Sequence, residues 1–416
     1  MATFRGTAAD DVLIGTPKND LLDGLLGVDT MTGGFGHDSY RVDDAADLIN
    51  EGIGEGTDSV VSSVSYTLPD NVEHLTLTRN AVLAFGNAGD NILRGTNQAN
   101  VLNGAAGADT MIGGGGDDVY FINQLSLDGI NNGGSAGTDV IIDASGRADL
   151  VICNAVGADD VFYILQTGLE QAFFIMPGTN ITLTGNRGSN WLVTDNGDDT
   201  LDGLQGADTL DGGDGANLYF VDNVRDIIVD GFDDTDADGP TDTADTVNVS
   251  VNYTFDAAAN VEFVNLTGTR NLSVTGSATD NVITGNAARN TIHGGGGDDE
   301  IHGGGDRDKL YGDTGADTFY FDTDTGLTSV VSIMDFNVSQ GDKINLEDIL
   351  SGYEDGIAVE GFVKIVDAGR SSFLTVNVNG DGIADNYVRI AVINGVIGLT
   401  SEQELVDQGI LILASS

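Results

Sequence analysis

Carboxylate and carboxamide side chains recur every nine residues in four blocks of the chain, each five residues after a glycine or, once, a threonine. The first block places them at Asp11, Asp20, Asp29 and Asp38. Calcium takes roughly six to eight oxygen ligands at about 2.4 Å, and it tolerates irregular cages of carboxylates and carbonyls. Carboxylates stacked at one spacing repel one another unless a cation lies between them. The pattern therefore predicts cation sites in a series of turns.

The elements that must position these aspartates follow from the same nine-residue unit. Its first six residues are rich in Gly, Asp and Asn, which favour a tight turn. The last three contain one apolar residue, at position eight, which predicts a short strand with one inward side chain. If two units complete one coil, units n and n+2 stack as a parallel ladder about 4.8 Å apart. In every block the last unit carries an aromatic at position eight: Tyr40, Tyr120, Tyr219 and Phe319.

Seventeen such units occur, and their best examples resemble a known family. Residues 33–41 read GGFGHDSYR and residues 113–121 read GGGGDDVYF. Both are similar to the glycine-rich nonapeptide of RTX (repeats-in-toxin, haemolysin-type calcium-binding) proteins, a repeat that forms a calcium-binding β-helix. The resemblance implies Ca²⁺ as the bound ion. Counting each unit with its second neighbour gives roughly nine sites.

The predicted calcium ligands are the aspartates at position six of the repeat. They are Asp11, Asp20, Asp29, Asp38, Asp109, Asp118, Asp199, Asp208, Asp299, Asp308 and Asp317. Units with Asn at this position carry less charge, so we expect them to bind calcium more weakly or to form uncharged Asn ladders.

The sequence predicts an all-β fold: a parallel β-roll or β-helix solenoid of calcium-binding nonapeptide repeats with a C-terminal β-rich cap. The repeat blocks are expected at 1–41, 86–121, 185–220 and 276–320. Alternating polar and apolar residues in the intervening segments predict half-buried strands without calcium turns. These segments are 42–85, 122–184 (more apolar) and 221–275, which includes an acidic loop at 233–245.

The last segment, 321–416, has less glycine and longer aliphatic runs. Residues 332–336 and 341–346, with the apolar 409–413, resemble the C-terminal region that type I secretion systems recognise; a simple cap on the solenoid is the alternative.

Residues 377–385 also resemble an EF-hand loop, which adds Asn379, Asp381 and Asp385 as weaker calcium ligands. Val388 stands where that loop would carry a bidentate Glu, and a plain Asn/Gly hairpin is the alternative.

Composition excludes several classes of function. With 16 basic and 66 acidic residues the formal charge is −50, so nucleic acid and anionic membranes are not expected partners. Cys153 is the single cysteine, which rules out an intrachain disulfide. Apolar runs are too short for a membrane helix, so no membrane insertion is expected. Residues 1–5 read MATFR and do not resemble a signal peptide, so we expect secretion by the type I route, to the extracellular space or cell surface.

No constellation in the sequence resembles an active site. Residues 133–137 fit G-x-S-x-G but follow no clear strand, and no His-Glu-x-x-His occurs. His293 and His302 share a repeat column, yet nine residues is half a coil, so they should lie on opposite sheets. The acid pairs 198–199 and 298–299 already belong to predicted calcium turns. We therefore expect no enzymatic activity.

The sequence thus favours a secreted, calcium-dependent structural protein, of a surface layer or matrix, that folds and self-assembles outside the cell. A cell-surface adhesin or carbohydrate-binding module is the first alternative. An accessory module of a secreted polysaccharide-modifying enzyme is the second. The expected partners are other copies of the chain, the type I secretion machinery during export and, for the first alternative, a cell-surface polysaccharide.

Overall fold

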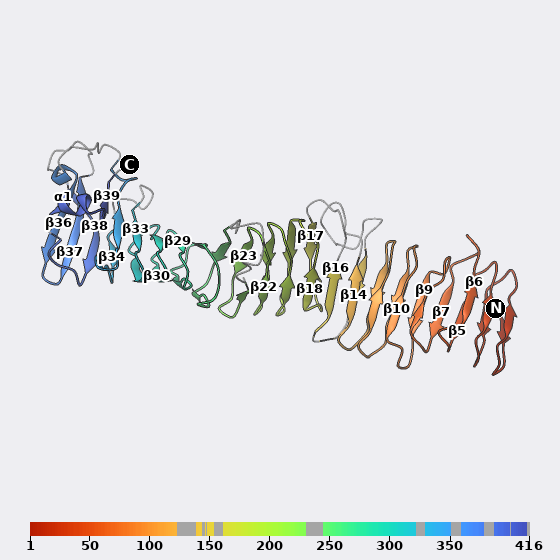
Figure 1. Cartoon of the computed structure of the whole chain (residues 1–416). Coiled ribbons are helices and arrows are strands. Elements are labelled where there is room, and N and C mark those ends of the chain that lie inside the picture. Colours follow the sequence, from red (N-terminus) through yellow and green to blue (C-terminus); the bar gives the residue numbers. More distant parts are fainter. Residues whose placement is uncertain are drawn as a thin grey trace. The chain divides into compact units, whose positions relative to one another are not determined.

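The computed structural model describes residues 1–122, 139–143, 146, 148–153, 161–229, 244–321, 329–350, 359–377, 387–399 and 401–413. These residues form two units, Met1–Gly213 and Asp214–Ser416. Both are built almost wholly from short parallel strands, which confirms the predicted all-β solenoid. In each unit the strands follow one another along the solenoid axis (Figure 1).

Two long parallel sheets run through the first unit. One contains β1 (Ala2–Arg5), β3 (Asp20–Asp23), β5 (Ser39–Val42), β7 (Ser59–Ser62), β9 (His74–Leu77), β11 (Ile92–Arg94), β13 (Thr110–Ile112) and β15 (Val140–Ile142). The other contains β8 (Tyr66–Thr67), β10 (Leu83–Phe85), β12 (Val101–Asn103), β14 (Val119–Ile122), β16 (Leu150–Cys153), β18 (Gln171–Phe174), β20 (Trp191–Val193) and β22 (Thr209–Asp211). Shorter stacks comprise β2 (Val12–Ile14), β4 (Thr30–Thr32) and β6 (Leu48–Asn50), and β17 (Val161–Ile164), β19 (Ile181–Thr184) and β21 (Thr200–Asp202).

Register within the repeat blocks follows the predicted pairing of units n and n+2. Leu22 pairs with Tyr40 and Leu102 with Tyr120, eighteen residues apart in each case. These position-eight side chains point inward and are fully buried. One apolar side chain per three-residue strand is enough because every coil adds another to the same column.

The segments between blocks continue the same sheets, as predicted. Strand β7 pairs with β5 of the first block on one side and with β9 on the other. In the more apolar segment, β16 and β18 join β14 to β20 in parallel register. The repeat blocks and the intervening segments of the first unit therefore share one hydrophobic core.

The second unit has a similar plan. One parallel sheet contains β23 (Leu218–Val221), β25 (Thr246–Val249), β27 (Phe263–Leu266), β29 (Val282–Thr284), β31 (Glu300–His302), β33 (Thr318–Tyr320), β35 (Lys343–Asn345) and β39 (Leu411–Ile412). The other contains β26 (Tyr253–Thr254), β28 (Ser273–Thr275), β30 (Thr291–Gly296), β32 (Lys309–Thr314), β34 (Val331–Ile333), β38 (Tyr387–Asn394), β37 (Ser371–Asn377) and β36 (Val363–Ala368). Strand β24 (Ile227–Val229) also belongs to this unit.

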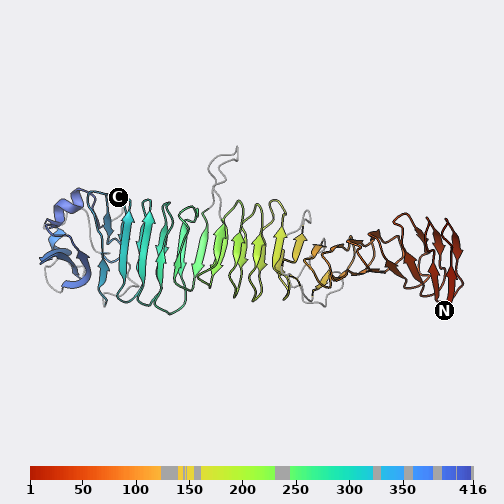
Figure 2. The same cartoon turned by 90° about the horizontal axis from the view of Figure 1, so that it is seen from below.

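The C-terminal part departs from the solenoid, as the predicted cap requires. Strand β37 is antiparallel to both of its neighbours, β36 and β38, and β38 joins the parallel sheet through β34. The short helices η2 (Val359–Gly361) and α1 (Glu402–Asp407) lie beside this sheet, at the blue end of the ribbon in Figure 2. Ser401 caps α1 by accepting a hydrogen bond from the backbone N–H of Glu404.

Candidate metal centre

Fifteen of the seventeen repeat turns fall into two classes that differ at the second residue of the unit; the turns that begin at Thr194 and Gly285 belong to neither. In nine turns this residue has a positive φ, which residues other than glycine rarely adopt. These second residues are Leu25, Gly34, Ala105, Gly114, Leu204, Gly213, Gly295, Gly304 and Asp313, with φ between 59° and 110°. We call these the open turns. They are the last two turns of each of the first three blocks and the last three turns of the fourth.

A second class, which we call the closed turns, satisfies the position-six side chain from within the turn. Thr16 donates its backbone N–H and its hydroxyl to the Asp20 carboxylate, both at 2.7 Å. Thr96 donates its backbone N–H to Asn100 Oδ1 at 2.6 Å. The second residues whose N–H groups make this bond are Thr7, Thr16, Asn87, Thr96, Asn186 and Ser277.

In six of the open turns one carboxylate oxygen of the position-six aspartate accepts a backbone N–H, and the other accepts no hydrogen bond from a described residue. Oδ1 of Asp109 accepts the N–H of Asn91 at 2.8 Å, and Oδ1 of Asp118 accepts that of Asn100 at 2.7 Å. Their Oδ2 atoms are buried and accept no hydrogen bond from any residue that the structure describes. The same holds for Asp29, Asp38, Asp299 and Asp308. Burying such an oxygen is costly, so a cation ligated there is the simplest compensation.

The turn backbone brings this oxygen over the first residue of the unit. A Cβ added to Gly104 would lie 2.0 Å from Asp109 Oδ2, and one added to Gly24 would lie 2.1 Å from Asp29 Oδ2. Real Cβ atoms cannot approach an oxygen so closely, so the carboxylate fold-back requires glycine at position one. Glycine therefore serves the placement of the carboxylate as well as the turn.

The pKa values of several position-six carboxyl groups also differ between open and closed turns. Burial raises the pKa of Asp109, Asp118 and Asp308 to about 7, and that of Asp299 to about 8. In the closed turn of Asp20, the hydrogen bond from the Thr16 side chain lowers the carboxyl pKa. The open turns thus hold carboxylates that favour neutralisation, by a proton or by a bound cation.

The predicted ligands divide accordingly. Asp11 and Asp20 lie in closed turns and accept hydrogen bonds from Thr7 and Thr16. The other nine predicted repeat aspartates are buried, with 1% or less of the residue exposed. Eight of them lie in open turns, and the ninth, Asp199, lies in the turn that begins at Thr194. Asn379, Asp381 and Asp385 lie outside the described residues. Thr, Asn or Ser at the second residue is the sequence signal for closure in these six turns, and the periodicity alone did not reveal it. Asn286 is the exception, because Asn290 Oδ1 in its turn accepts no hydrogen bond from a described residue.

Hard oxygen donors from buried aspartates, glycine at position one and left-handed turns together fit a calcium site. A family model for the RTX calcium-binding nonapeptide repeat matches residues 5–40, 85–120, 184–219, 275–310 and 300–325. The chain carries RTX calcium-binding repeats. Such repeats bind calcium, and these matches coincide with the four blocks of open and closed turns.

Two curated relatives match part of the RTX chain. The endo-1,3-1,4-beta-glycanase ExsH of Rhizobium meliloti (strain 1021) is 42% identical over 95 residues, which is 23% of this chain and 20% of the relative. The endo-1,3-1,4-beta-glycanase EglC of the same organism is 35% identical over 95 residues, with the same coverage. The match therefore spans about a fifth of the length of each relative.

The candidate catalytic residues are not brought together in the part of the RTX chain that the structure describes. His293 lies on β30 and His302 on β31, in different sheets, as predicted. Each stacks on a tyrosine of its own sheet, Tyr311 at 4.0 Å and Tyr320 at 4.4 Å between ring centroids. Residues 133–137 lie outside the described ranges. Among the described residues, no helix is both long and apolar enough to cross a membrane.

Proposed function

We propose that this chain is a secreted, calcium-dependent structural protein that folds and self-assembles outside the cell. The observation that carries the proposal is the series of buried aspartates in open turns, six of which have a carboxylate oxygen that accepts no hydrogen bond from a described residue. Eight open turns carry an aspartate at position six, and about one calcium ion for each would neutralise these carboxylates; the ninth, which begins at Gly212, carries Asn217 instead. The closed turns need no ion because Thr, Asn or Ser supplies the hydrogen bond instead.

Charge couples folding to the ion. The chain has a formal charge of −50, and stacked carboxylates oppose compaction when calcium is scarce. Calcium that binds the folded turns and not the unfolded chain stabilises the fold by mass action, for every occupied site. At low intracellular calcium the chain would stay unfolded, which suits export. It would then fold outside the cell, where calcium is abundant.

Self-assembly is supported by apolar side chains on the outer face of the first block. Val12 and Ile14 on β2 and Leu48 on β6 are 72%, 67% and 59% exposed. On this face Thr30 of β4 lies between Val12 and Leu48, and the exposed apolar side chains on either side of it favour contact with another protein surface. Calcium bridging between acidic surfaces of neighbouring copies would add to this contact.

Electron microscopy of the purified chain, without calcium and after its addition, tests the proposal. Sheets, tubes or filaments that form only with calcium support an assembling structural protein. Compact single particles in calcium, with full β-structure, would keep calcium-dependent folding and refute assembly. A Leu48→Asp variant is the matched test of the apolar face, since it should fold normally and assemble less.

A second candidate function is binding of an acidic polysaccharide at the cell surface. In this strongly acidic chain, Arg5, Arg41 and Arg79 line a groove of about 300 Å³ in the first unit. Arg5 and Arg41 lie on either side of Asp23, with N–O distances of 3.7 and 3.6 Å. Guanidinium groups bind carboxylates through two parallel hydrogen bonds, so the groove suits an anionic sugar.

The names of the two relatives point to polysaccharides as well, which makes an accessory role beside a polysaccharide-degrading activity the third candidate. Affinity electrophoresis in gels containing alginate, with β-glucan as the neutral control, separates these candidates. Retardation by alginate that Arg41→Ala abolishes supports the acidic-polysaccharide site. Retardation by β-glucan favours the accessory role, and retardation by neither leaves the structural proposal.

A further inference from the structure

An acidic side chain lies over the first glycine of the last repeat unit in each of the first two blocks. Thr32 of β4 pairs with Asn50 of β6, so the next residue, Glu51, lies beside Gly33. Ile112 of β13 pairs with Ile142 of β15, so Asp143 lies beside Gly113. Both acids come from the segments between blocks, which the sequence predicts to lack calcium turns. In the repeats themselves this position is normally glycine, or once threonine.

A tyrosine from the last repeat unit fixes each of these acids. The Tyr40 hydroxyl donates a hydrogen bond to Glu51 Oε1. The Tyr120 hydroxyl donates to Asp143 Oδ2 at 2.6 Å. The tyrosine rings are fully buried, so the hydroxyl is presented from the core at a fixed position. The tyrosine hydroxyl at the end of each block thus orients the Glu51 or Asp143 carboxylate toward the repeat turn.

Two more carboxylates complete each group. In the first, Asp38 and Asp58 are each 1% exposed, and their Oδ2 atoms accept no hydrogen bond within the described chain. Glu51 Oε2 is buried and also lacks a donor among described residues. One carboxylate oxygen from each of these three residues lies within 4.8 Å of the others.

The second group repeats this arrangement at the end of the second block. Asp118 and Asp149 are both fully buried, and neither Oδ2 receives a hydrogen bond from a described residue. Together with Asp143 they bring three ligand oxygens within 4.8 Å of one another. Asp58 and Asp149 correspond in register, since each Oδ1 accepts the backbone N–H of the last repeat aspartate, Asp38 or Asp118.

We propose that these two groups are calcium sites in which two of the three carboxylates come from outside the nonapeptide repeats. Glu51 and Asp58 are ligands of the first site, and Asp143 and Asp149 of the second. Three carboxylates give each site more negative charge than an open turn whose repeat aspartate has only turn carbonyls beside it. Because calcium affinity rises with ligand charge, these junction sites bind calcium more tightly than the repeat turns.

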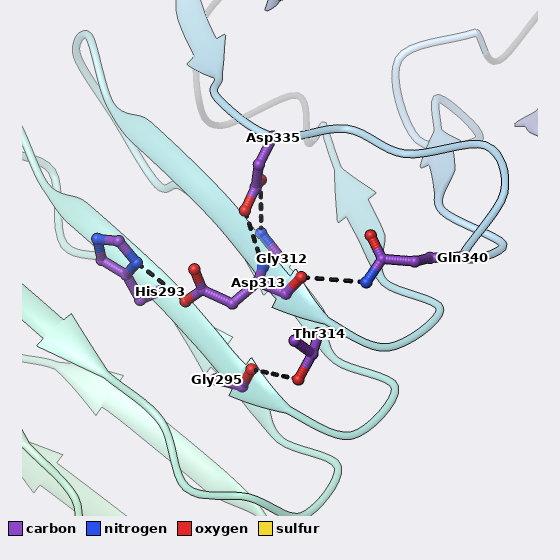
Figure 3. A network of polar contacts seen from close by, with 7 residues as sticks. All are labelled: His293, Gly295, Gly312, Asp313, Thr314, Asp335 and Gln340. Atoms are coloured by element: carbon purple, nitrogen blue, oxygen red, sulfur yellow. Dashed lines mark hydrogen bonds and ion pairs between the residues drawn. The ribbon is translucent and has the colours of Figure 1, made fainter.

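The fourth block provides an internal comparison, because Phe319 replaces the tyrosine. Leu310 pairs with Ile333, so Asp335 lies over Gly312, as Glu51 lies over Gly33. Without a hydroxyl to bind, the Asp335 carboxylate accepts the backbone N–H groups of Gly312 and Asp313, at 3.0 and 2.9 Å (Figure 3). Its oxygens therefore have donors already. Among the described residues, Asp335 belongs to no group of three clustered carboxylates.

This inference extends the calcium-binding part of the proposed function and does not depend on self-assembly. The junction sites use the open turns of Asp38 and Asp118; if these sites fail, calcium binding by the other open turns is unaffected. If calcium-dependent folding fails altogether, no variant will bind the ion. The two failures are therefore distinguishable in one titration.

Terbium luminescence tests the proposal in the full-length chain, because Tb³⁺ replaces Ca²⁺ at oxygen sites and is excited by a nearby tyrosine. The double variant Glu51→Gln/Asp143→Asn should lose two equivalents of the tightest Tb³⁺ binding, with affinity there reduced about tenfold or more. The matched control Asp335→Asn changes the same register position in the fourth block and should keep both equivalents. Circular dichroism in calcium verifies that each variant is folded.

Unchanged tight binding in a folded double variant would overturn the proposal, as would equal loss in the Asp335→Asn control. Should the double variant fail to fold, crystals of the unaltered chain in Tb³⁺ decide the question by anomalous scattering. A peak among Asp38, Glu51 and Asp58, and another among Asp118, Asp143 and Asp149, supports the sites. Peaks confined to other turns refute them.

Discussion

Replacing Asp109 with asparagine should change stability in opposite directions at low and at high calcium. Asparagine keeps Oδ1 as the acceptor for the Asn91 N–H but replaces the buried Oδ2 with an amide nitrogen. Without calcium this removes an uncompensated charge. With calcium it removes a ligand. The free energy of unfolding should therefore rise in the first condition and fall in the second.

Both effects can be estimated. Burial raises the pKa of Asp109 from 3.8 to about 7, so keeping it ionised in the fold at pH 8 costs at most about 4 kcal/mol. Solvent screening around the turn reduces this to about 2 kcal/mol. One calcium ion at a thousand times its Kd stabilises the fold by about 4 kcal/mol. The variant should thus be about 2 kcal/mol more stable without calcium and about 2 kcal/mol less stable at saturation.

Urea unfolding at pH 8, followed by circular dichroism at free calcium concentrations from the lowest that folds the chain up to saturation, measures the crossing. The dependence of unfolding free energy on the logarithm of calcium concentration should show one fewer bound ion in Asp109→Asn. The matched control, Asp20→Asn, alters a closed turn and should bind as many ions as the unaltered chain. The division into open and closed turns would be refuted if the unfolding free energies of Asp109→Asn and the unaltered chain depended equally on calcium concentration. Loss of a bound ion in Asp20→Asn would refute it as well.

Three further predictions concern protonation, backbone and core. Because burial raises the pKa of Asp299 to about 8 and of Asp109 to about 7, each stabilises the calcium-free fold when protonated. That stability is lost as the pH rises through these values, so in calcium-free buffer circular dichroism should show more β-structure at pH 5 than at pH 8; less β-structure at pH 5 would contradict this. Gly34→Ala should cost only about 1–2 kcal/mol because no described atom lies within 4 Å of the new Cβ. Gly114→Ala should cost clearly more because its Cβ would lie 2.1 Å from the Thr96 carbonyl oxygen, and equal thermal midpoints for the two would count against this turn geometry. Leu192→Ala, at a fully buried position, should cost about 2–5 kcal/mol in calcium, and a loss below 1 kcal/mol would argue against a shared core.

The nine-residue period predicted the parts of the fold that depend on one unit and its second neighbour. Leu22 and Met31 are buried at position eight, and Asp38 is buried at position six, because each place is set by local turn and strand geometry. The opposite placement of His293 and His302 followed from the same half-coil argument. Their stacking on Tyr311 and Tyr320 was also implied by units n and n+2, although it was not predicted.

The nine-residue period alone does not separate closed from open turns. The sequence separates them only when the second residue of each unit is considered together with the aspartate at position six. The period treats Asp20 and Asp38 as equivalent. The second residue of each unit separates them, because Thr16 donates to its own aspartate while Gly34 adopts a left-handed conformation and leaves Asp38 Oδ2 without a donor among the described residues.

The junction groups could not be predicted from spacing alone. Thr32 pairs with a residue eighteen positions later, whereas Ser39 pairs with one twenty positions later. The turn between β6 and β7 is therefore two residues longer than a repeat turn. Where Glu51 lies depends on that register, which the surrounding strands determine, and the segment has no nine-residue spacing of its own.

Calcium-dependent folding is the central claim, and one measurement tests it most directly. Far-UV circular dichroism of the full chain at pH 8 should show a largely unfolded polypeptide in EGTA and a β-rich spectrum after addition of millimolar calcium. Magnesium at the same concentration should not replace calcium, because the irregular oxygen cages of the turns suit the larger ion. A full β-spectrum in EGTA, unchanged by calcium, would contradict the account.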